Sequence, residues 1–409
     1  MQYVIIGNGP AAVSAVEAIR RYDPEGSITL FSKEKEFTYS RPLISYLLLG
    51  ETDERRMRYK PDDFYQINGV NLRLGVEAVA IDKEAHTVTA SDGSNIAYDR
   101  LLLATGAVPF VPPIEGLQSV PYHTFMTLED ARFLKAALTP ESRVLIVGAG
   151  LIGLKCLEGI RHLCASVTVC DLAEQILPSI LDREAAALVQ RHIERQDVTF
   201  LLGDSAVKLA PGEATMKSGR KVSFDVLVMA VGVRPATALA CGLGLDAARG
   251  IRTDWRGETA IPGIFAAGDC ACSEDITTDT TRVLALLPNA VMQGEICGTA
   301  MAGYSAQSYN AIPMNAMGMF GLHMITAGPM VGEDHIIRTE GGYKRLCTRD
   351  NRLMGYIMVG DVERAGIYTA LIREKTPLDS IDFALMLEKP QLMAFSKRDR
   401  QTLMGGSRL

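Results

Sequence analysis

The chain has 409 residues, 47% apolar and 22% charged, which is enough for two or three ordered domains. A formal charge of −6 and a pI near 5.7 argue against a general nucleic-acid-binding protein. The eight cysteines form no CxxC pair and the six histidines form no HxxxH or HExxH pattern, so we expect reduced thiols and no metal site.

The N-terminal residues lead directly into an apolar strand, YVIIG, without the basic and apolar segments of a signal peptide. The longest apolar stretch, residues 314–331, is interrupted by three glycines, a proline and a histidine. A stretch broken in this way makes a poor membrane span. We therefore expect a cytoplasmic protein that makes no contact with a membrane.

The first predicted unit is a buried strand, a glycine turn and a helix, in the sequence YVIIGNGPAAVSAVEAIR. Gly7 permits a tight turn, Gly9 lets the backbone approach a pyrophosphate, and Ala12 lets the helix pack closely on the sheet. A GxGxxA pattern alone is a weak signal, but its place between strand and helix predicts a dinucleotide site. The candidate cofactor-binding residues of this turn are Gly7, Gly9, Pro10, Ala11 and Ala12.

The next predicted strand, SITLFS at residues 27–32, ends without the acidic residue that usually binds a ribose. Ser32 and Lys33 are the candidate cofactor contacts at its end, and Glu34 is an alternative acid. The interpretation that neither Ser32 nor Glu34 touches a ligand stays open.

The spacing between repeated motifs indicates an insertion in the first unit, at residues 36–64. It contains the stretch FTYSRPLISYLL, residues 37–48, and a basic run at residues 55–60. Charged runs are usually solvated, but a basic run can also dock an acidic electron carrier. Both interpretations stay open.

The second predicted unit, RVLIVGAGLIGLKCLEGIR at residues 143–161, repeats the strand, turn and helix with a full GxGxxG. Its second strand ends in Asp171, where a carboxylate accepts hydrogen bonds from ribose hydroxyls and repels a 2′-phosphate. Residues 172–174 supply no arginine for such a phosphate, so the unit is predicted to prefer NADH over NADPH. The candidate residues are Gly148, Gly150, Leu151, Ile152, Gly153 and Asp171.

A second motif also occurs twice, as YDRLLLATGAVP at residues 98–109 and FDVLVMAVGVRP at residues 224–235. Two motif types that repeat in the same order predict two related α/β domains. From about residue 309, short β-like runs and one helix predict a separate α+β domain.

This order of two Rossmann units, an ATG segment and an AAGD segment resembles the FAD- and NAD(P)-dependent pyridine nucleotide–disulfide oxidoreductase superfamily over nearly the whole chain. Residues 37–48 and 308–328 look most like the branch of NADH oxidases, rubredoxin reductases and nitrite-reductase-like flavoproteins. The resemblance implies two glutathione-reductase-type Rossmann domains and a C-terminal α+β interface domain. The expected ranges are 1–115 with 245–308 for FAD, 116–244 for NADH, and 309–409 for the C-terminal domain.

The resemblance also implies roles for residues outside the glycine turns. Gly268 and Asp269 are expected to face the flavin ribityl chain and pyrophosphate, and a helix N-terminus at Leu287 is expected to face the flavin pyrimidine, where its positive end favours negative charge. The remaining implied cofactor contacts are Ala78 (against the adenine), Ala104, Thr105, Gly106, Gly232, Pro288 and Asn289.

The chain departs from the family most clearly at Arg41, which aligns with the redox-active cysteine of the single-cysteine members. No CxxxxC pair follows either, and a guanidinium cannot store electrons as a thiolate does. We therefore expect the flavin to be the sole redox centre. Arg41 with Pro42 is expected to hold the FAD pyrophosphate. The alternative is a surface arginine that steadies a loop.

Lys155 stands where relatives carry a glutamate, close to where nicotinamide and flavin stack. It is a tentative catalytic residue that orients the carboxamide through water or attracts an anionic substrate; the alternative is a lysine that points to solvent. Cys270 and Cys272 follow the AAGD segment, and we expect them to be buried thiols without a redox role.

These features together predict an FAD-dependent NADH oxidoreductase. NADH is expected to reduce the flavin, which then passes electrons to an external acceptor, with a rubredoxin-like or ferredoxin-like carrier favoured. Two alternatives stay open: an NADH oxidase or small-molecule reductase, and an FAD-binding subunit of a larger redox complex. The expected partners are a small acidic electron carrier and a second copy of the chain in a homodimer.

Overall fold

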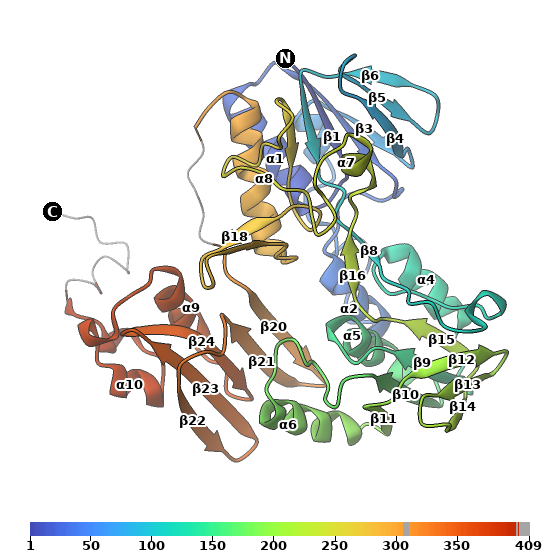
Figure 1. The fold of residues 1–409 in the computed structure, drawn as a ribbon, viewed down its shortest axis with the longest axis vertical. Coiled ribbons are helices and arrows are strands. Elements are labelled where there is room, and N and C mark those ends of the chain that lie inside the picture. Colours follow the sequence, from blue (N-terminus) through green and yellow to red (C-terminus); the bar gives the residue numbers. More distant parts are fainter. Residues whose placement is uncertain (306–310, 398–399, 401–409) are drawn as a thin grey trace.

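The computed structural model describes residues 1–305, 311–397 and residue 400. Parts of the ranges expected for the FAD domain (306–308) and for the C-terminal domain (309–310, 398–399 and 401–409) therefore lie outside the described residues. The fold class agrees with the prediction, because two Rossmann-like regions and a C-terminal α+β region are present (Figure 1). The boundaries proposed between them stay predictions.

The first Rossmann-like region is built on a five-stranded parallel sheet in the order β17-β7-β1-β2-β3. The YVII segment of β1 is buried on both faces, as expected for the centre of a parallel sheet. The strands are β1 (Gln2–Ile6), β2 (Ser27–Ser32), β3 (Val70–Leu74), β7 (Arg100–Leu103) and β17 (Ile264–Ala266). Beside them lie the antiparallel strands β4 (Ala78–Asp82), β5 (Thr87–Ala90) and β6 (Asn95–Ala97), and the helix α3 (Phe64–Ile67).

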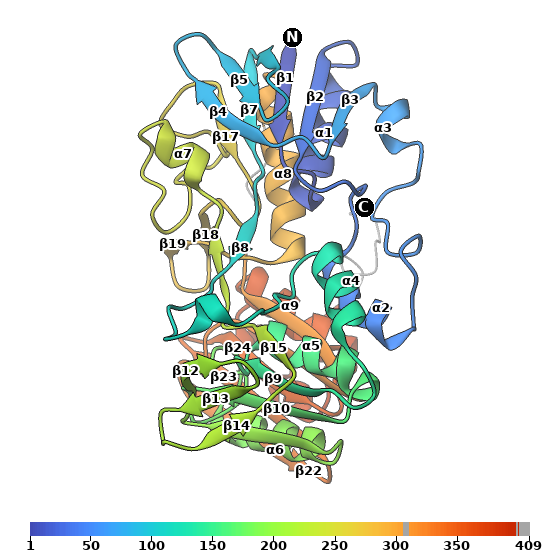
Figure 2. The same ribbon diagram turned by 90° about the vertical axis from the view of Figure 1, so that its right-hand side faces the viewer.

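Two helices distant in sequence, α1 (Pro10–Tyr22) and α8 (Leu287–Met301), lie side by side against this sheet (Figures 1 and 2). A Cβ added to Gly294 would lie 2.1 Å from the Ala11 carbonyl oxygen, and one added to Gly298 would lie 2.4 Å from that of Ala15. Glycine on α8 therefore permits the close approach of the two helix backbones, and this fixes α8 relative to the first glycine turn.

The second Rossmann-like region has a four-stranded parallel sheet in the order β11-β10-β9-β15. The strands are β9 (Arg143–Val147), β10 (Ser166–Asp171), β11 (Val198–Leu202) and β15 (Val226–Met229), with an antiparallel sheet of β12 (Ala206–Ala210), β13 (Glu213–Met216) and β14 (Lys221–Ser223) beside them. The helical elements are η2 (Leu117–Ser119), α4 (Leu128–Ala137), α5 (Leu151–Ile160), η3 (Arg161–Leu163) and α6 (Arg183–Glu194).

The two Rossmann-like regions are joined by a two-stranded antiparallel ribbon of β8 (Ala107–Pro109) and β16 (Val233–Pro235). These strands are the final residues of the repeated segments ATGAVP and AVGVRP, so the two copies of the second motif pair with each other. The chain crosses from the upper region to the lower right one through this ribbon (Figure 1). The short helix α7 (Ala238–Gly242) follows β16.

The C-terminal region is a five-stranded antiparallel sheet in the order β20-β21-β24-β23-β22. Its strands are β20 (Met314–Met319), β21 (Leu322–Ala327), β22 (Glu333–Thr339), β23 (Gly342–Arg349) and β24 (Arg352–Val359). Its helical elements are α9 (Ala365–Arg373), η4 (Leu378–Ser380), α10 (Phe383–Glu388) and η5 (Leu392–Ala394), and a hairpin of β18 (Ser273–Asp275) and β19 (Thr280–Arg282) precedes α8.

One hydrophobic cluster reaches across the regions and surrounds α5, the helix after the second glycine turn. It joins Leu48 of α2 (Ile44–Leu49), Leu157 of α5, and Met319 and Val359 of the C-terminal sheet. A Cβ on Gly159 would lie 3.1 Å from the Ser45 carbonyl oxygen, so α2 and α5 pack closely. The helix of the second turn is therefore held on two sides.

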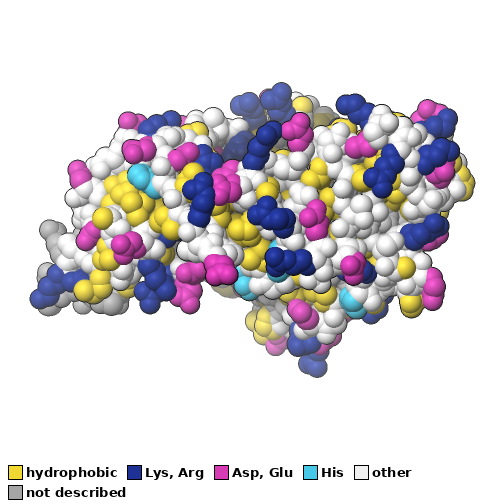
Figure 3. Space-filling model, turned by 90° about the horizontal axis from the view of Figure 1, so that it is seen from below, with side chains coloured by type: hydrophobic (Ala, Val, Ile, Leu, Met, Phe, Trp, Pro, Cys, Tyr) yellow, Lys and Arg dark blue, Asp and Glu magenta, His cyan; other side chains and the backbone are white. Residues whose placement is uncertain are grey.

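The charged surface is mixed in sign. Figure 3 shows basic and acidic side chains interspersed on the face seen from below. Polar contacts join the C-terminal sheet to the start of α6. Asp182, the N-cap of α6, accepts hydrogen bonds from Tyr343 at 2.7 Å and from Arg345 at 3.0 Å. Among the described residues, no helix combines the length and the apolar character needed to cross a bilayer.

Candidate functional site

The first glycine turn has the geometry of a nucleotide cradle. Gly7 has φ of +109°, and a Cβ there would lie 2.0 Å from the Ala104 carbonyl oxygen, so no other residue fits. Gly9 forms the N-cap of α1, and a Cβ on it would meet nothing within 4 Å. Space therefore exists in front of the helix N-terminus, where a pyrophosphate would accept backbone N–H bonds.

A polar network that the sequence did not indicate supports this turn. The Asn8 side-chain oxygen accepts hydrogen bonds from the hydroxyls of Thr38, at 2.8 Å, and Tyr65, at 2.7 Å. Thr38 is 3% exposed, so the bonds lie in a buried setting where they hold geometry firmly. The network fixes the start of the stretch FTYSRPLISYLL against the first glycine turn.

The end of β2 carries Ser32 and Lys33 in place of the acidic residue that usually binds a ribose. Ser32 is buried, and its hydroxyl donates to the Glu34 carbonyl oxygen at 2.9 Å. Lys33 is largely exposed and forms an ion pair with Glu77 at 3.1 Å. The Glu34 carboxylate accepts from the Tyr39 hydroxyl at 2.6 Å and from the Arg41 guanidinium. Glu34 is thus occupied by its protein partners.

Arg41 begins the η1 turn (Arg41–Leu43) and is held by a carboxylate and a carbonyl. Its guanidinium forms an ion pair with Glu34 and donates to the Met126 carbonyl oxygen at 2.9 Å. The side chain remains 43% exposed, so part of the guanidinium fork faces outward. Arg41 also lies near the AAGD segment: burial raises the pKa of the Asp269 carboxyl, and the charge of Arg41 opposes that rise.

The AAGD segment and the N-terminus of α8 are fixed to each other. The Gln293 side-chain oxygen of α8 accepts a hydrogen bond from the Gly268 backbone N–H at 2.5 Å. Asn289, in the first turn of α8, is 3% exposed and donates to the Leu284 carbonyl oxygen at 3.5 Å. Gly268 and Asp269 follow the end of β17, so these groups gather at the carboxyl edge of the first parallel sheet, where ligands bind in such folds.

The second glycine turn repeats the geometry of the first. Gly148 has φ of +116°, and a Cβ there would lie 2.3 Å from the Ala230 carbonyl oxygen. Gly150, the N-cap of α5, again has nothing within 4 Å of an added Cβ. The Asp171 carboxylate lies beside this turn, because it accepts hydrogen bonds from the backbone N–H groups of Ala149 at 2.7 Å and Ala173 at 2.8 Å.

Lys155 of α5 lies in a cage between three parts of the chain. Its ammonium forms an ion pair with Glu158, donates to the Gly318 carbonyl oxygen at 3.3 Å, and lies 4.4 Å from the ring centroid of Tyr46. The side chain is 19% exposed, so it does not simply point to solvent. Glu158 also accepts from the Phe320 N–H at 2.7 Å, which ties α5 to the turn between β20 and β21.

The basic run at residues 55–60 is largely neutralised by neighbouring acids. Arg56 pairs with Asp53 at 2.8 Å, and Lys60 pairs with Glu17 at 2.5 Å. Arg58 pairs with Asp62. These contacts favour the interpretation of a solvated face over a free cationic docking surface.

The two cysteines near the AAGD segment are buried free thiols. Burial raises the pKa of both the Cys270 and the Cys272 thiol. The Cys270 thiol donates to the Leu103 and Ala267 carbonyl oxygens, each at 3.3 Å. A protonated, hydrogen-bonded thiol is a poor nucleophile, as expected for a structural cysteine.

The other candidate positions lie around the two turns and the connecting ribbon. Thr105 donates to the Ala236 carbonyl oxygen at 2.6 Å, which ties the ATG segment to the return crossing. Ala78 is buried at the start of β4. Gly106 and Gly232 flank the ribbon, each with positive φ and nothing within 4 Å of an added Cβ. Pro42, Leu151, Ile152, Leu287 and Pro288 lie in the first turns of their helical segments.

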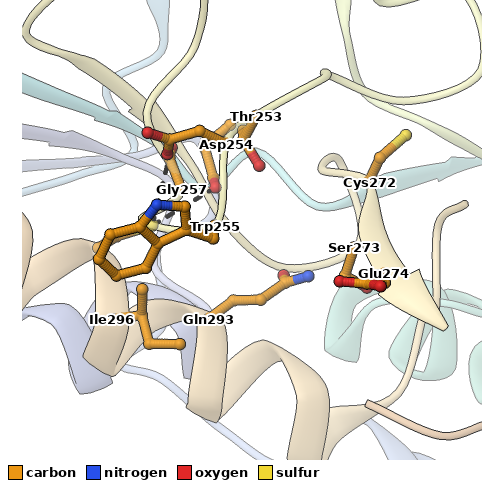
Figure 4. A pocket seen from close by; sticks show the side chains of 11 residues that line it. Thr253, Asp254, Trp255, Gly257, Cys272, Ser273, Glu274, Gln293 and Ile296 are labelled. Carbon is orange, nitrogen blue, oxygen red and sulfur yellow. Dashed lines mark hydrogen bonds between the residues drawn. The ribbon is translucent and has the colours of Figure 1, made fainter. Parts of the chain in front are cut away.

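A separate cavity of about 80 Å³ is lined in part by Gln293 of α8 (Figure 4). Trp255, which is 59% exposed, lines it together with Ile296 and Cys297 of α8. The Ser273 hydroxyl lines it too and, among the described residues, is a buried oxygen without a hydrogen-bond partner. The glycine turns contribute nothing to its wall, so it is distinct from the nucleotide cradles.

Both cradles fit a dinucleotide, because each combines open space at a glycine N-cap with a carboxylate at the same sheet edge. The family model described as "Pyridine nucleotide-disulphide oxidoreductase" matches residues 1–294.

Named relatives are similar over most of the chain. The NADH-dependent phenylglyoxylate dehydrogenase subunit epsilon of Aromatoleum evansii is 32% identical over 92% of this chain and 92% of its own length. A rubredoxin-NAD(+) reductase of Pseudomonas putida is 32% identical over 75% of this chain and 81% of its own. The reductase–putidaredoxin covalent complex matches with a TM-score of 0.87 and 22% identity, covering 99% of each chain, which supports the fold alone.

Proposed function

The chain belongs to the pyridine nucleotide-disulphide oxidoreductase family and is an NAD(P)H-dependent flavin oxidoreductase, and on this premise we propose that NADH is its reductant and a one-electron carrier protein its acceptor. FAD, when bound, accepts a hydride and releases electrons singly, which links a nicotinamide to a one-electron carrier. The chain's own residues hold and orient the two nucleotides and determine where electrons leave.

FAD is assigned to the first cradle. The N-terminus of α1 behind Gly9 would meet the pyrophosphate, and the outward part of the Arg41 fork supplies a positive charge for the same group. Asp269 at the sheet edge would accept hydrogen bonds from ribityl hydroxyls. Asp269 is half-buried, and the hydrogen bond between Gln293 and the preceding residue, Gly268, supports a positioning role for it.

NADH is assigned to the second cradle. The Asp171 carboxylate is held by two backbone N–H groups, so its orientation is set before any ligand arrives. A carboxylate accepts further hydrogen bonds with its remaining lone pairs, which suits the two hydroxyls of an NADH ribose. A 2′-phosphate in the same place would be repelled.

Arg41 is the observation that carries the proposal of an external acceptor. By the resemblance described above it stands at the position of the redox cysteine of single-cysteine members, and its guanidinium is held by Glu34 and the Met126 carbonyl oxygen. Of the eight cysteines, seven are buried free thiols, and the exposed one, Cys241, lies on α7. Burial raises the pKa of the thiols next to the AAGD segment, which makes them poor redox groups, so we infer that electrons leave the flavin for an outside acceptor. Relatives named as rubredoxin and ferredoxin reductases support a carrier protein.

A second candidate is an FAD-binding subunit of a larger redox complex. The relative from Aromatoleum evansii is named as a subunit, and the similarity covers 92% of both chains. On this reading the isolated chain would be reduced by NADH but would need a partner subunit for turnover. Sedimentation of the purified chain would show whether it forms a homodimer without any other subunit.

Anaerobic stopped-flow absorbance of the FAD-loaded protein tests the proposal. NADH should bleach the flavin absorbance, and rubredoxin or a plant-type ferredoxin should restore it much faster than dissolved oxygen does. If NADH does not bleach the flavin absorbance, both the carrier-reductase proposal and the oxidase alternative are excluded. Recovery that is faster with oxygen than with either carrier would favour the oxidase alternative, and recovery with neither would favour the subunit alternative.

The ribose assignment has its own test. Asp171→Ala should lower kcat/KM for NADH and narrow the preference for NADH over NADPH by about tenfold or more, because the Asp171 carboxylate would accept both ribose hydrogen bonds. An unchanged ratio of the two kcat/KM values would show that Asp171 does not meet the ribose.

A further inference from the structure

An exposed ion pair lies just beyond the residue assigned to the NADH ribose. The Arg183 guanidinium donates to the Glu174 carboxylate at 2.8 Å, and the two side chains are 85% and 78% exposed. The residues that directly follow Asp171 include no arginine, so the fold, and not the local sequence, brings Arg183 here.

The backbone places this pair at the edge of the second cradle. The Asp171 carboxylate accepts from Ala173 N–H at 2.8 Å, and the Ala173 carbonyl oxygen accepts from Gly203 N–H at 2.8 Å. Asp171 ends β10 and Gly203 follows β11, so Ala173 is anchored to the carboxyl ends of two neighbouring strands. Glu174 comes next and lies at that same edge, and Arg183 joins it from the first position of α6.

We propose that Glu174 is a specificity-determining residue that withholds Arg183 from a 2′-phosphate and so strengthens the preference for NADH. The inference rests on the proposed binding of NADH to the second cradle. Arginine presents a planar fork that suits phosphate, so an unpaired Arg183 at this edge would favour NADPH.

Charge counting supports the same conclusion. Asp171 and Glu174 are negative and Arg183 is positive, which leaves the edge with one net negative charge against a phosphate that carries about −1.5 to −2. Loss of the Glu174 charge would bring the edge to neutrality and would also release the guanidinium. Because the Arg183 side chain is 85% exposed, the guanidinium would then be free to turn towards a phosphate.

The test uses the FAD-loaded protein and the oxidised nucleotides NAD⁺ and NADP⁺ as probes, with dissociation constants from calorimetry at low salt. Glu174→Gln should tighten NADP⁺ by about fivefold and leave NAD⁺ within about twofold. Adding Arg183→Ala to that variant should remove the gain. Glu213→Gln, which breaks an exposed pair on β13 of the same region, is the matched control and should change neither constant.

Two results would overturn the inference: no tightening of NADP⁺ in Glu174→Gln, or a tightening that persists when Arg183 is also replaced. Either would leave the proposed function standing if Asp171→Ala still narrows the preference for NADH. If Asp171→Ala has no effect on nucleotide preference, the proposed placement of the NADH ribose beside Asp171 fails, whatever the Glu174 variants do.

Discussion

The contact between α5 and the C-terminal sheet depends on Glu158, and replacing this residue tests how the second glycine turn is held. The carboxylate is 8% exposed and accepts from Phe320 N–H at 2.7 Å and from the Lys155 ammonium. In Glu158→Ala the Phe320 N–H loses its acceptor and Lys155 loses its counter-charge within the cage.

The magnitude follows from those two losses. An unsatisfied buried N–H costs about 1–3 kcal/mol, and a buried charge stripped of its partner costs about 3–5 kcal/mol. Lys155 keeps the Gly318 carbonyl oxygen, the Tyr46 ring and 19% exposure, so it relaxes in part. We expect Glu158→Ala to lower the free energy of unfolding by about 3 kcal/mol in total. Glu158→Gln, which keeps an acceptor for Phe320, should cost about half as much.

Urea denaturation of the FAD-loaded protein, with hydrogen exchange at Phe320, measures this effect. Exchange at the Phe320 amide should accelerate in Glu158→Ala, because that amide has lost its acceptor. The double variant Lys155→Met/Glu158→Gln should be less destabilised than the sum of its single variants, since both charges leave together. If the loss of stability in the double variant equals the sum of the losses in the two single variants, Lys155 and Glu158 do not act as one buried pair.

Three further outcomes are expected. Gly294→Val should force α8 away from α1 and reduce the flavin-to-protein ratio after purification, whereas Gly366→Ala, in open space on α9, should leave that ratio unchanged. Tyr39→Phe should lower the free energy of unfolding by about 1–2 kcal/mol in urea, because the part-buried hydrogen bond to Glu34 and the buried one from Leu128 N–H are lost. The Arg143 hydrogen bonds lower the pKa of Asp225 from 3.8 to about 2. Asp225→Asn should therefore be less stable than the unmodified protein at neutral pH, by less than about 1 kcal/mol for this half-exposed pair. The difference in the free energy of unfolding should disappear as the pH falls from 3.8 to 2, because Asp225 then becomes protonated.

The sequence was sufficient to predict the two glycine turns between strand and helix, because glycine patterns report backbone geometry directly. Gly7 and Gly148 adopt positive φ where a Cβ would collide with a neighbouring carbonyl, which is the constraint that their spacing encodes. Repetition of both motifs in one order was likewise sufficient to predict two related α/β regions. The ribbon of β8 and β16 adds that the repeated segments pair with each other.

The side-chain partners around the cradles could not be predicted, because they come from distant segments. Arg183 reaches Glu174 only when α6 folds back on the end of β10, and Phe320 reaches Glu158 across 162 residues. Lys155 and Glu158 stand three residues apart on α5, a spacing that brings two side chains to one face of a helix. The third member of that cage, Tyr46, had no such signal.

The number of electrons that the protein takes up tests most directly whether the flavin is its sole redox centre. An anaerobic titration of the FAD-loaded protein with NADH, followed by absorbance and a thiol count before and after, gives this number. Arg41 stands where the family resemblance places a redox cysteine, so the expected end point is two electrons per flavin and an unchanged number of titratable thiols. Four electrons per flavin with new thiols would reveal a second, disulfide-type centre and would contradict the assignment.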